Sequence, residues 1–196
     1  MNDWEQLYQK GDTQWDKGEP SPGLVDWLEG KENDGQSVLI PGCGFGHDVR
    51  AWAQAGYDAV GYDLAPSAVS GAQERTSKEL SNARFKLGDF LEDIPFAQFD
   101  FVFEHTCFCA INPRKRDDYA SAVHQWLKPG GEFLAVHYML PKDEEGPPFG
   151  VDKEEIVARF SKHLELLSHW SPRSYPNREG LERMFLWKKA LVDCQR

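Results

Sequence analysis

The chain has 196 residues and a formal net charge of −10, with 22 Lys and Arg against 32 Asp and Glu. Because 40% of the residues are hydrophobic and 13% are aromatic, the chain can bury a sizeable core, which excludes disordered and fibrous classes and predicts one globular domain over residues 1–196. The acidic balance argues against a nucleic-acid partner, since such proteins concentrate positive charge to displace counterions. No apolar run approaches the roughly 18 residues of a membrane span, and residues 1–5 lack a signal-peptide pattern, so we expect a cytoplasmic protein with no membrane partner.

Strand and helix signals alternate along residues 37–140. Short apolar or alternating runs predict five strands, at 37–40, 59–62, 83–87, 99–103 and 132–138. Helical spacing between these runs predicts helices at 48–55, 66–80 and 113–127. The run Lys128-Pro129-Gly130-Gly131 then predicts a helix stop and a turn.

After Val151 we expect a further helix and two more strands, near 164–169 and 182–188. Repeated strand–helix–strand units indicate an α/β fold with a mostly parallel, seven-stranded sheet and helices on both faces. Such sheets bind ligands at the carboxyl ends of their strands. Residues 1–30 precede the first strand and are rich in aromatic side chains, which predicts a helical extension across that edge. Packing as plain core is the alternative.

The four cysteines are too few and too unevenly spaced for a disulfide framework, so we interpret them as reduced thiols: Cys43, Cys107, Cys109 and Cys194. A Cys-x-Cys pair without further nearby ligands is a weak metal or redox signal, and no metal site is expected. The remaining histidines show no metal-ligand spacing and are interpreted as structural or surface residues: His124, His137, His163 and His169. Three arginines of the last third are interpreted as solvated, with contact to an anionic substrate as the alternative: Arg173, Arg178 and Arg183.

The strongest local signal is a glycine turn, Gly42-x-Gly44-x-Gly46, which directly follows an apolar strand and precedes a helix. Glycines allow a tight turn or a close approach of backbone to a ligand. A dinucleotide fingerprint would need a third glycine at His47, so a dehydrogenase turn fits less well. Asp63 lies 21 residues after Gly42, at the end of the second strand, where a carboxylate can accept hydrogen bonds from ribose hydroxyls. We interpret this pattern as a nucleoside site, with a tight turn that binds no ligand as the alternative.

Two further strand ends carry acidic residues. Asp89 and Phe90 follow the third strand and could bind adenine through a hydrogen bond and ring packing; a turn aspartate beside a core phenylalanine is the alternative. Glu104 ends the fourth strand and could face a cationic ligand, although an exposed strand-end carboxylate fits equally well.

Together these residues resemble the first two motifs of class I S-adenosylmethionine-dependent methyltransferases, which have a Rossmann-like fold. Further segments follow in the order seen in the thiopurine S-methyltransferase superfamily: Trp15-Asp16-Lys17-Gly18, Phe108-Cys109-Ala110-Ile111-Asn112-Pro113-Arg114-Lys115-Arg116, Leu127-Lys128-Pro129-Gly130-Gly131 and Gly146-Pro147-Pro148-Phe149. Within it the chain is most similar to the plant and fungal branch that methylates thiols, thiocyanate and halide ions. The resemblance spans roughly residues 4–189.

The resemblance implies S-adenosyl-L-methionine as cofactor, S-adenosyl-L-homocysteine as product, a small-molecule acceptor and a monomer. It also implies a set of cofactor-binding residues: Trp4, Tyr8, Trp15, Gly42, Asp63, Asp89, Phe90 and Glu104. The first three would close over the cofactor as an N-terminal cap formed by residues 1–30. Gly42 would approach the methionine part, and Asp63 the ribose. Glu104 would lie near the methionyl end, with adenine at Asp89 and Phe90.

Two positions depart from the family pattern. Tyr8 stands where the family more often has a second tryptophan, which keeps an aromatic wall. His105 follows Glu104 where the thiocyanate and halide branch tends to have tyrosine and the thiopurine branch arginine.

The acceptor determines what His105 would do. A thiol reacts as its thiolate, and an imidazole with a pKa near 6.5 can deprotonate or orient it near neutral pH. We therefore predict His105 as the catalytic residue, with a merely structural hydrogen-bonding role as the alternative. The expected activity is methyl transfer to a thiol or sulfide, or to thiocyanate or a halide; a small-molecule N- or O-methyltransferase and a non-catalytic S-adenosylmethionine sensor are the rival functions.

Overall fold

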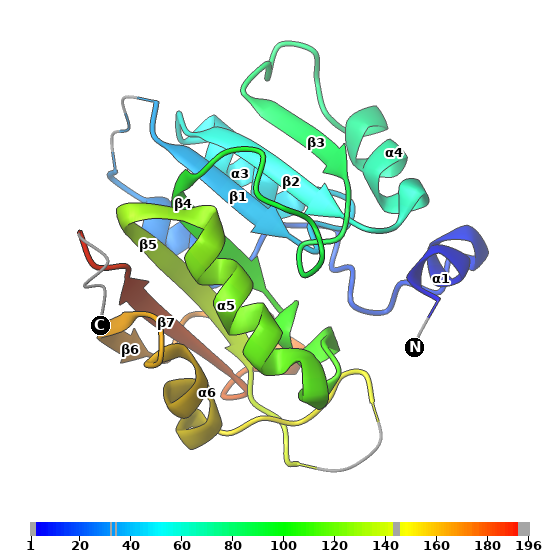
Figure 1. Ribbon diagram of the computed structural model, residues 1–196. Coiled ribbons are helices and arrows are strands. Elements are labelled where there is room, and N and C mark those ends of the chain that lie inside the picture. Colours follow the sequence, from blue (N-terminus) through cyan, green and yellow to red (C-terminus); the bar gives the residue numbers. More distant parts are fainter. Residues whose placement is uncertain (1–2, 32, 34, 143–145, 192–196) are drawn as a thin grey trace. The chain divides into compact units, whose positions relative to one another are not determined.

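The computed structural model describes residues 3–31, 33, 35–142 and 146–191 (Figure 1). The chain divides into two compact units, Met1–Asp93 and Ile94–Arg196. The expectation of one domain over residues 1–196 stays a prediction. Cys194 lies outside the described residues.

Three parallel strands form the sheet of the first unit, in the order β3-β2-β1. They are β1 (Ser37–Pro41), β2 (Asp58–Asp63) and β3 (Ala83–Leu87). The helices of this unit are α1 (Trp4–Lys10), α2 (Pro22–Leu28), α3 (His47–Gln54) and α4 (Pro66–Glu74). Pro41 pairs with Tyr62 and Asp63 pairs with Leu87, so the carboxyl ends of the three strands share one edge.

The strands of the second unit follow the order β4-β5-β7-β6. They are β4 (Phe99–His105), β5 (Leu127–Tyr138), β6 (Glu165–Trp170) and β7 (Glu182–Lys188). β4 and β5 are parallel, whereas β7 runs antiparallel to both β5 and β6. The helices are α5 (Arg116–Trp126) and α6 (Lys153–Phe160), with short 3-10 turns η1 (Phe108–Ala110), η2 (Pro113–Lys115) and η3 (Pro176–Arg178). The predicted fold class, a mostly parallel seven-stranded α/β sheet, is confirmed.

Each unit buries apolar side chains between its strands and helices. In the first unit Trp52 of α3 is fully buried and contacts Tyr57 edge to face, with ring centroids 4.5 Å apart. In the second unit Trp126, Phe160 and Trp187 are buried to 1% exposure or less. In Figure 1, α5 crosses in front of β5. Its buried residues include Tyr119, Val123 and Trp126, which are spaced by four and three residues as on one face of a helix.

Two predicted boundaries are wrong. The helix expected at 66–80 ends at Glu74, because the Thr76 hydroxyl donates to the Ala72 carbonyl at 2.7 Å and the Arg75 guanidinium to the Gly71 carbonyl at 2.8 Å. These side chains satisfy the last free carbonyls of the helix.

The second correction concerns the turn expected at 128–131; the helix stop predicted there is confirmed, because α5 ends at Trp126. These residues belong to β5 and form no turn between helix and strand, since β5 begins at Leu127. Gly130, at φ 77°, donates to the carbonyl of Lys189 at 3.1 Å, and the Lys189 N–H donates to Gly131 at 2.9 Å. A register shift between Phe99 and Phe101 accommodates this irregular start.

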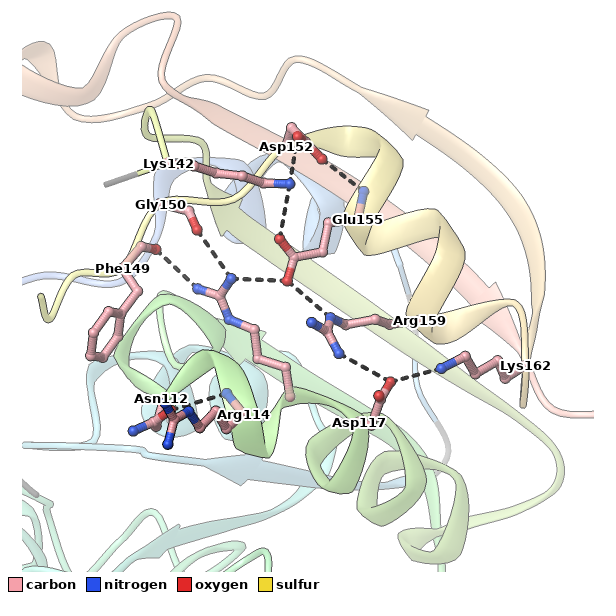
Figure 2. A network of polar contacts seen from close by, with 11 residues as sticks. Asn112, Arg114, Asp117, Lys142, Phe149, Gly150, Asp152, Glu155, Arg159 and Lys162 are labelled. Carbon is pink, nitrogen blue, oxygen red and sulfur yellow. Dashed lines mark hydrogen bonds and ion pairs between the residues drawn. The ribbon is translucent and has the colours of Figure 1, made fainter. Parts of the chain in front are cut away.

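A buried arginine fixes the return from β5 to α6. Arg116, 1% exposed, donates to the carbonyls of Phe149 and Gly150 and to the Glu155 carboxylate, at 3.0 to 3.1 Å. Figure 2 shows these acceptors, with Arg159 on the far side of the same carboxylate. One side chain therefore joins α5, α6 and the segment that precedes α6.

Candidate functional site

The glycine turn lies at the carboxyl end of β1. The N–H groups of Gly42 and Cys43 donate to the Tyr62 carbonyl at 2.8 and 3.3 Å, which ties the turn to β2. Gly42, Gly44 and Gly46 have φ values of 62°, 54° and 77°, a region that other residues rarely adopt. A Cβ at Gly46 would lie 2.5 Å from Cε1 of Phe85. The turn therefore needs glycine at these three positions, and the side chains between them are those of Cys43 and Phe45.

Asp63 ends β2 beside this turn and is 7% exposed. Its carboxylate accepts from the N–H of Gly44 at 2.9 Å and from the N–H of Ala65 at 3.0 Å. Burial raises the pKa of Asp63, and these hydrogen bonds only partly offset the rise. The N–H of Leu64 bonds to the same carboxylate. A carboxylate has about four acceptor directions, so about one remains for a ribose hydroxyl.

Aromatic side chains of the N-terminal segment lie over the turn. The Tyr8 ring contacts Trp15 and Phe45 edge to face, with centroids 5.6 and 5.2 Å apart, and Trp4 lies 5.3 Å from Trp15. The Tyr8 hydroxyl accepts from Nε1 of Trp15 at 3.2 Å. It lies 3.0 Å from where a Cβ of Gly44 would stand. Burial, and then the nearby Asp63 charge, raise the pKa of Tyr8.

Polar contacts hold this segment to the helices of its own unit. The Glu5 carboxylate accepts from the N–H of Ser67 at 2.8 Å and from its hydroxyl at 2.7 Å, at the start of α4. Nε2 of His47 lies 3.0 Å from the Asp16 carboxylate at the start of α3. In Figure 1, α1 lies beside α4.

The last part of the N-terminal extension, α2, packs against α3 and not over the glycine turn. Trp27 of α2 packs against Trp52 of α3, with centroids 5.1 Å apart. Trp27 therefore packs against the core, as the alternative predicted. Tyr8 and Trp15 lie over the glycine turn, and their role as a cap over a ligand stays a prediction.

Asp89 and Phe90 follow β3 at the same edge as Gly42 and Asp63. Phe90 is 8% exposed. The Asp89 carboxylate accepts from the N–H of Leu91 at 2.9 Å, which is the turn contact expected of the structural alternative. One oxygen serves this contact, so a role toward adenine remains compatible with the geometry.

Glu104 is fully buried in the second unit, so the alternative of an exposed strand-end carboxylate is wrong. One oxygen accepts from the N–H of Cys107 at 2.8 Å and of Phe108 at 3.1 Å. The other lies 2.7 Å from Nδ1 of His137, a β5 residue that is 1% exposed. His137 was predicted to be structural or at the surface, and its burial excludes the surface position.

His105 ends β4 in a polar cluster of the second unit. Its Nε2 lies 3.6 Å from the carboxylate of Glu182, and its ring stacks on Tyr175 with centroids 5.9 Å apart. The His105 side chain is 11% exposed, while the Glu182 side chain is fully buried. The next residue, Thr106, has φ 59°, a left-handed conformation that costs a β-branched residue about 1 to 3 kcal/mol. Such strain is common at functional sites.

Arg178 is the clearest correction among the site residues. The prediction of a solvated side chain is wrong, because Arg178 is 6% exposed and donates to the Glu182 carboxylate at 3.1 Å. Its guanidinium also lies over the Tyr138 ring at 4.8 Å. The sequence did not reveal Glu182 and Tyr175 as partners of His105, nor Arg178 as the partner of Glu182. The local signal was the i,i+4 spacing of Arg178 and Glu182.

Among the described residues, Cys43, Cys107 and Cys109 form no disulfide, and the expectation of reduced thiols stays a prediction. Burial, and then the Glu104 charge, raise the pKa of Cys109 to about 12, so its thiol is inert at neutral pH. Within the described ranges, no three His, Cys, Asp or Glu side chains converge as metal ligands would. In the same ranges no helix is long and apolar enough to cross a bilayer.

Comparison with solved structures identifies the fold. A chain from the structure described as "Conversion of a Disulfide Bond into a Thioacetal Group during Echinomycin Biosynthesis" has a TM-score of 0.74 at 22% identity, covering 92% of this chain and 85% of that one. The 1,6-didemethyltoxoflavin-N1-methyltransferase of Burkholderia thailandensis, solved with S-adenosylhomocysteine, has a TM-score of 0.70 at 19% identity, covering 96% and 86%. The fold is that of class I S-adenosylmethionine-dependent methyltransferases.

Sequence comparison defines the family. Residues 1–180 match the thiopurine S-methyltransferase (TPMT) family. Probable thiol methyltransferase 2 of Arabidopsis thaliana is 33% identical over 199 residues, covering 95% of this chain and 84% of that protein. Thiocyanate methyltransferase 1 of the same plant is 32% identical over 191 residues, with the same coverage. The chain belongs to the thiopurine S-methyltransferase family, and it is an enzyme that uses S-adenosylmethionine as its cofactor to methylate a soft nucleophile.

Proposed function

We propose that the physiological acceptor is a small thiol or hydrosulfide, with thiocyanate and halide ions as further acceptors. The observation that carries this proposal is the 32 to 33% identity, over 95% of the chain, to proteins named as thiol and thiocyanate methyltransferases. A buried strand-end cluster containing a histidine supports a thiol in particular, since a thiol must lose a proton before it reacts.

The cofactor residues are assigned by their place at the carboxyl edge of the first unit's sheet. Gly42 borders the methionine part, Asp63 accepts from the ribose, and Asp89 with Phe90 borders the adenine. Two observations support a nucleoside at this edge: the positive-φ glycines of the turn, and the Asp63 carboxylate, which keeps about one acceptor direction after its three backbone hydrogen bonds.

The remaining assignments come from the N-terminal segment and from β4. Trp4, Tyr8 and Trp15 shield the cofactor from water as a cap formed by residues 1–30. An aromatic face such as that of Trp15 stabilises a sulfonium by about 0.5 to 2 kcal/mol. The Glu104 carboxylate accepts from the N–H groups of Cys107 and Phe108 and lies against the His137 ring. We therefore assign it an indirect role, in which it fixes the backbone that borders the methionyl end of the cofactor.

Bound S-adenosylmethionine supplies an electrophilic methyl group on a sulfonium sulfur. His105 takes the thiol proton, the thiolate sulfur bonds to the methyl carbon, and the carbon–sulfonium bond breaks to leave a methyl thioether and S-adenosylhomocysteine. The protein's contribution is alignment and exclusion of water, which can supply several kcal/mol without a metal. An acceptor that is already an anion needs no proton transfer, and His105 then donates a hydrogen bond to it.

We further propose a cytoplasmic monomer with one methyltransferase domain and with neither nucleic-acid nor membrane partners. The net charge of −10 supports the absence of a nucleic-acid partner. Light scattering of the purified protein tests the oligomeric state.

Release of S-adenosylhomocysteine tests the function, with hydrosulfide, iodide, thiocyanate and thiophenol offered separately to the intact protein and to His105→Ala. Product with thiols that falls sharply in the variant is the expected result. If His105→Ala forms product from thiols as fast as the intact protein does, His105 has no catalytic role. Cofactor binding without product from any acceptor would favour an oxygen or nitrogen acceptor, or a non-catalytic sensor.

A further inference from the structure

The inference concerns a buried carboxylate that faces His105 from another strand. Glu182 begins β7, which is antiparallel to β5, so it lies at the edge of the second unit where β4 and β5 end. Its side chain is fully buried, and its Oε1 lies 3.6 Å from Nε2 of His105. A buried charge is costly unless it is paired, and here the pairing includes a titratable ring.

Arg178 fixes this carboxylate in place. It donates from Nη1 to the same Oε1 at 3.1 Å, four residues away across the end of η3. Its guanidinium is confined between the rings of Tyr138 and Tyr175, at 4.8 and 5.8 Å. Tyr175 in turn stacks on His105, so the imidazole is held on one face by a ring and at one nitrogen by a carboxylate.

The charges around Glu182 agree with this arrangement. Burial alone raises the pKa of the Glu182 carboxyl, but the surrounding groups, His105 first, lower it by more. By linkage, the ionised carboxylate favours the protonated form of His105. The other ionisable pair near the end of β4 is Glu104 with His137, and Oε1 of the first lies 2.7 Å from Nδ1 of the second.

We propose that Glu182, held by Arg178, is a positioning residue that orients His105 and stabilises the imidazolium formed when a thiol loses its proton. This inference rests on the proposed function. The proton passes from the thiol sulfur to the imidazole and later to water, and Glu182 stays ionised throughout. The nitrogen of His105 that faces the carboxylate is Nε2.

The test compares two acceptors in the full chain carrying Glu182→Gln. With 2-mercaptoethanol, which must be deprotonated, we expect kcat to fall tenfold or more, within the range of general-base effects. With iodide, which carries no proton, we expect a change of less than about twofold. The acidic limb of the pH–rate profile for the thiol shifts to lower pH, because the imidazole loses the negative charge that favours its protonation. Glu182→Asp should restore part of the thiol rate.

Matched controls separate positioning from folding. Glu179→Gln changes an exposed carboxylate of the same segment and should leave both rates unchanged. Equal losses with thiol and iodide in Glu182→Gln, or an unmoved acidic limb, would overturn the inference.

A measurement without turnover distinguishes this inference from the function itself. The NMR titration of the His105 ring, assigned with His105→Ala, should show a lower midpoint in Glu182→Gln than in the wild type. If the wild type methylates none of the acceptors but this midpoint moves, the proposed function fails while the His105–Glu182 coupling stands. If the wild type is active and the midpoint stays, the inference alone fails.

Discussion

The backbone N–H of Gly44 donates to the carboxylate of Asp63 at 2.9 Å, so a single side chain connects the glycine turn after β1 to the end of β2. These two positions come from the two strongest motifs in the sequence. Their contact explains why the motifs occur together: the residue proposed to bind ribose also sets the shape of the turn that borders the methionine part.

Replacing this carboxylate should weaken cofactor binding more than it weakens the fold. In Asp63→Ala we expect the dissociation constant of S-adenosylmethionine to rise tenfold or more, since loss of about 1.4 kcal/mol corresponds to tenfold. Titration calorimetry measures it. Asp58→Ala, at the opposite end of β2 in an exposed pair with Arg84, is the control and should bind normally. Equal affinities in both variants would refute the assignment of Asp63.

The third glycine of the turn should be intolerant of a side chain for two separable reasons. Gly46→Ala introduces left-handed strain and a Cβ only 2.5 Å from Phe85. Gly180→Ala has a similar φ of 75° but no atom within 4 Å of its Cβ. The clash should therefore cost Gly46→Ala about 1 to 3 kcal/mol beyond the control. Thermal unfolding would show this as an extra drop of about 2 to 4 °C per kcal/mol, and equal drops would mean that Phe85 yields freely.

The contact between Glu5 and Ser67 should control the mobility of α1. The hydroxyl of Ser67, and then its N–H, lower the pKa of Glu5. A lowered folded pKa stabilises the contact above the ordinary carboxyl pKa, and this contribution is lost as the pH falls through the folded value. Glu5→Gln should therefore speed amide hydrogen exchange in residues 4–10 at pH 7, with little difference from the wild type once the wild-type carboxylate is protonated. Glu29→Gln, an exposed residue after α2, should exchange as the wild type does. Unchanged exchange in Glu5→Gln would remove this role.

The carboxylate under Arg116 should contribute pH-dependent stability. Burial raises the pKa of Glu155, but hydrogen bonds from Arg116 and Arg159 lower it below its ordinary value. Its contribution is then present above the unfolded pKa and lost as the pH falls through the folded one. Glu155→Gln weakens the partner of a buried guanidinium, which we expect to cost about 1 kcal/mol after solvent screening, or about 2 to 4 °C at pH 7.

Thermal unfolding over a pH series checks this expectation. The difference in melting temperature between the wild type and Glu155→Gln should narrow below pH 4, where carboxyl groups ordinarily titrate. The neighbouring Glu154→Gln is exposed and should match the wild type throughout. If this difference in melting temperature does not change with pH, the loss of stability comes from altered packing and not from the loss of charge.

Local sequence patterns predicted the strands well because alternation and apolar runs directly reflect burial on a sheet. The same patterns misjudged residues 128–131, since glycine and proline usually end an element, whereas here Gly130 pairs with the chain after β7. That partner lies far away in sequence. The end of α4 was missed for a related reason, because Thr76 and Arg75 stop it through side-chain bonds that periodicity does not report.

The site residues also fall into two groups, those that local motifs predict and those whose partners lie far away in the sequence. Motifs with fixed spacing, such as Gly42 and Asp63, were predictable because one strand–turn–helix unit carries them. The partners of Glu104 and His105 were not, since His137 and Glu182 reach them from β5 and β7. Nothing local to a carboxylate in the sequence distinguishes one that is buried and paired from one that is solvated.

The closed pair of Glu104 and His137 has a consequence for how this enzyme could diversify. Because this carboxylate is satisfied within its own unit, neighbouring positions can change without leaving a charge stranded in the core. The residues around His105, at positions 138, 175, 178 and 182, all follow Ile94, whereas the glycine turn and Asp63 precede it. Laboratory evolution confined to the later positions could therefore explore new acceptors while it inherits the cofactor residues of the first unit intact.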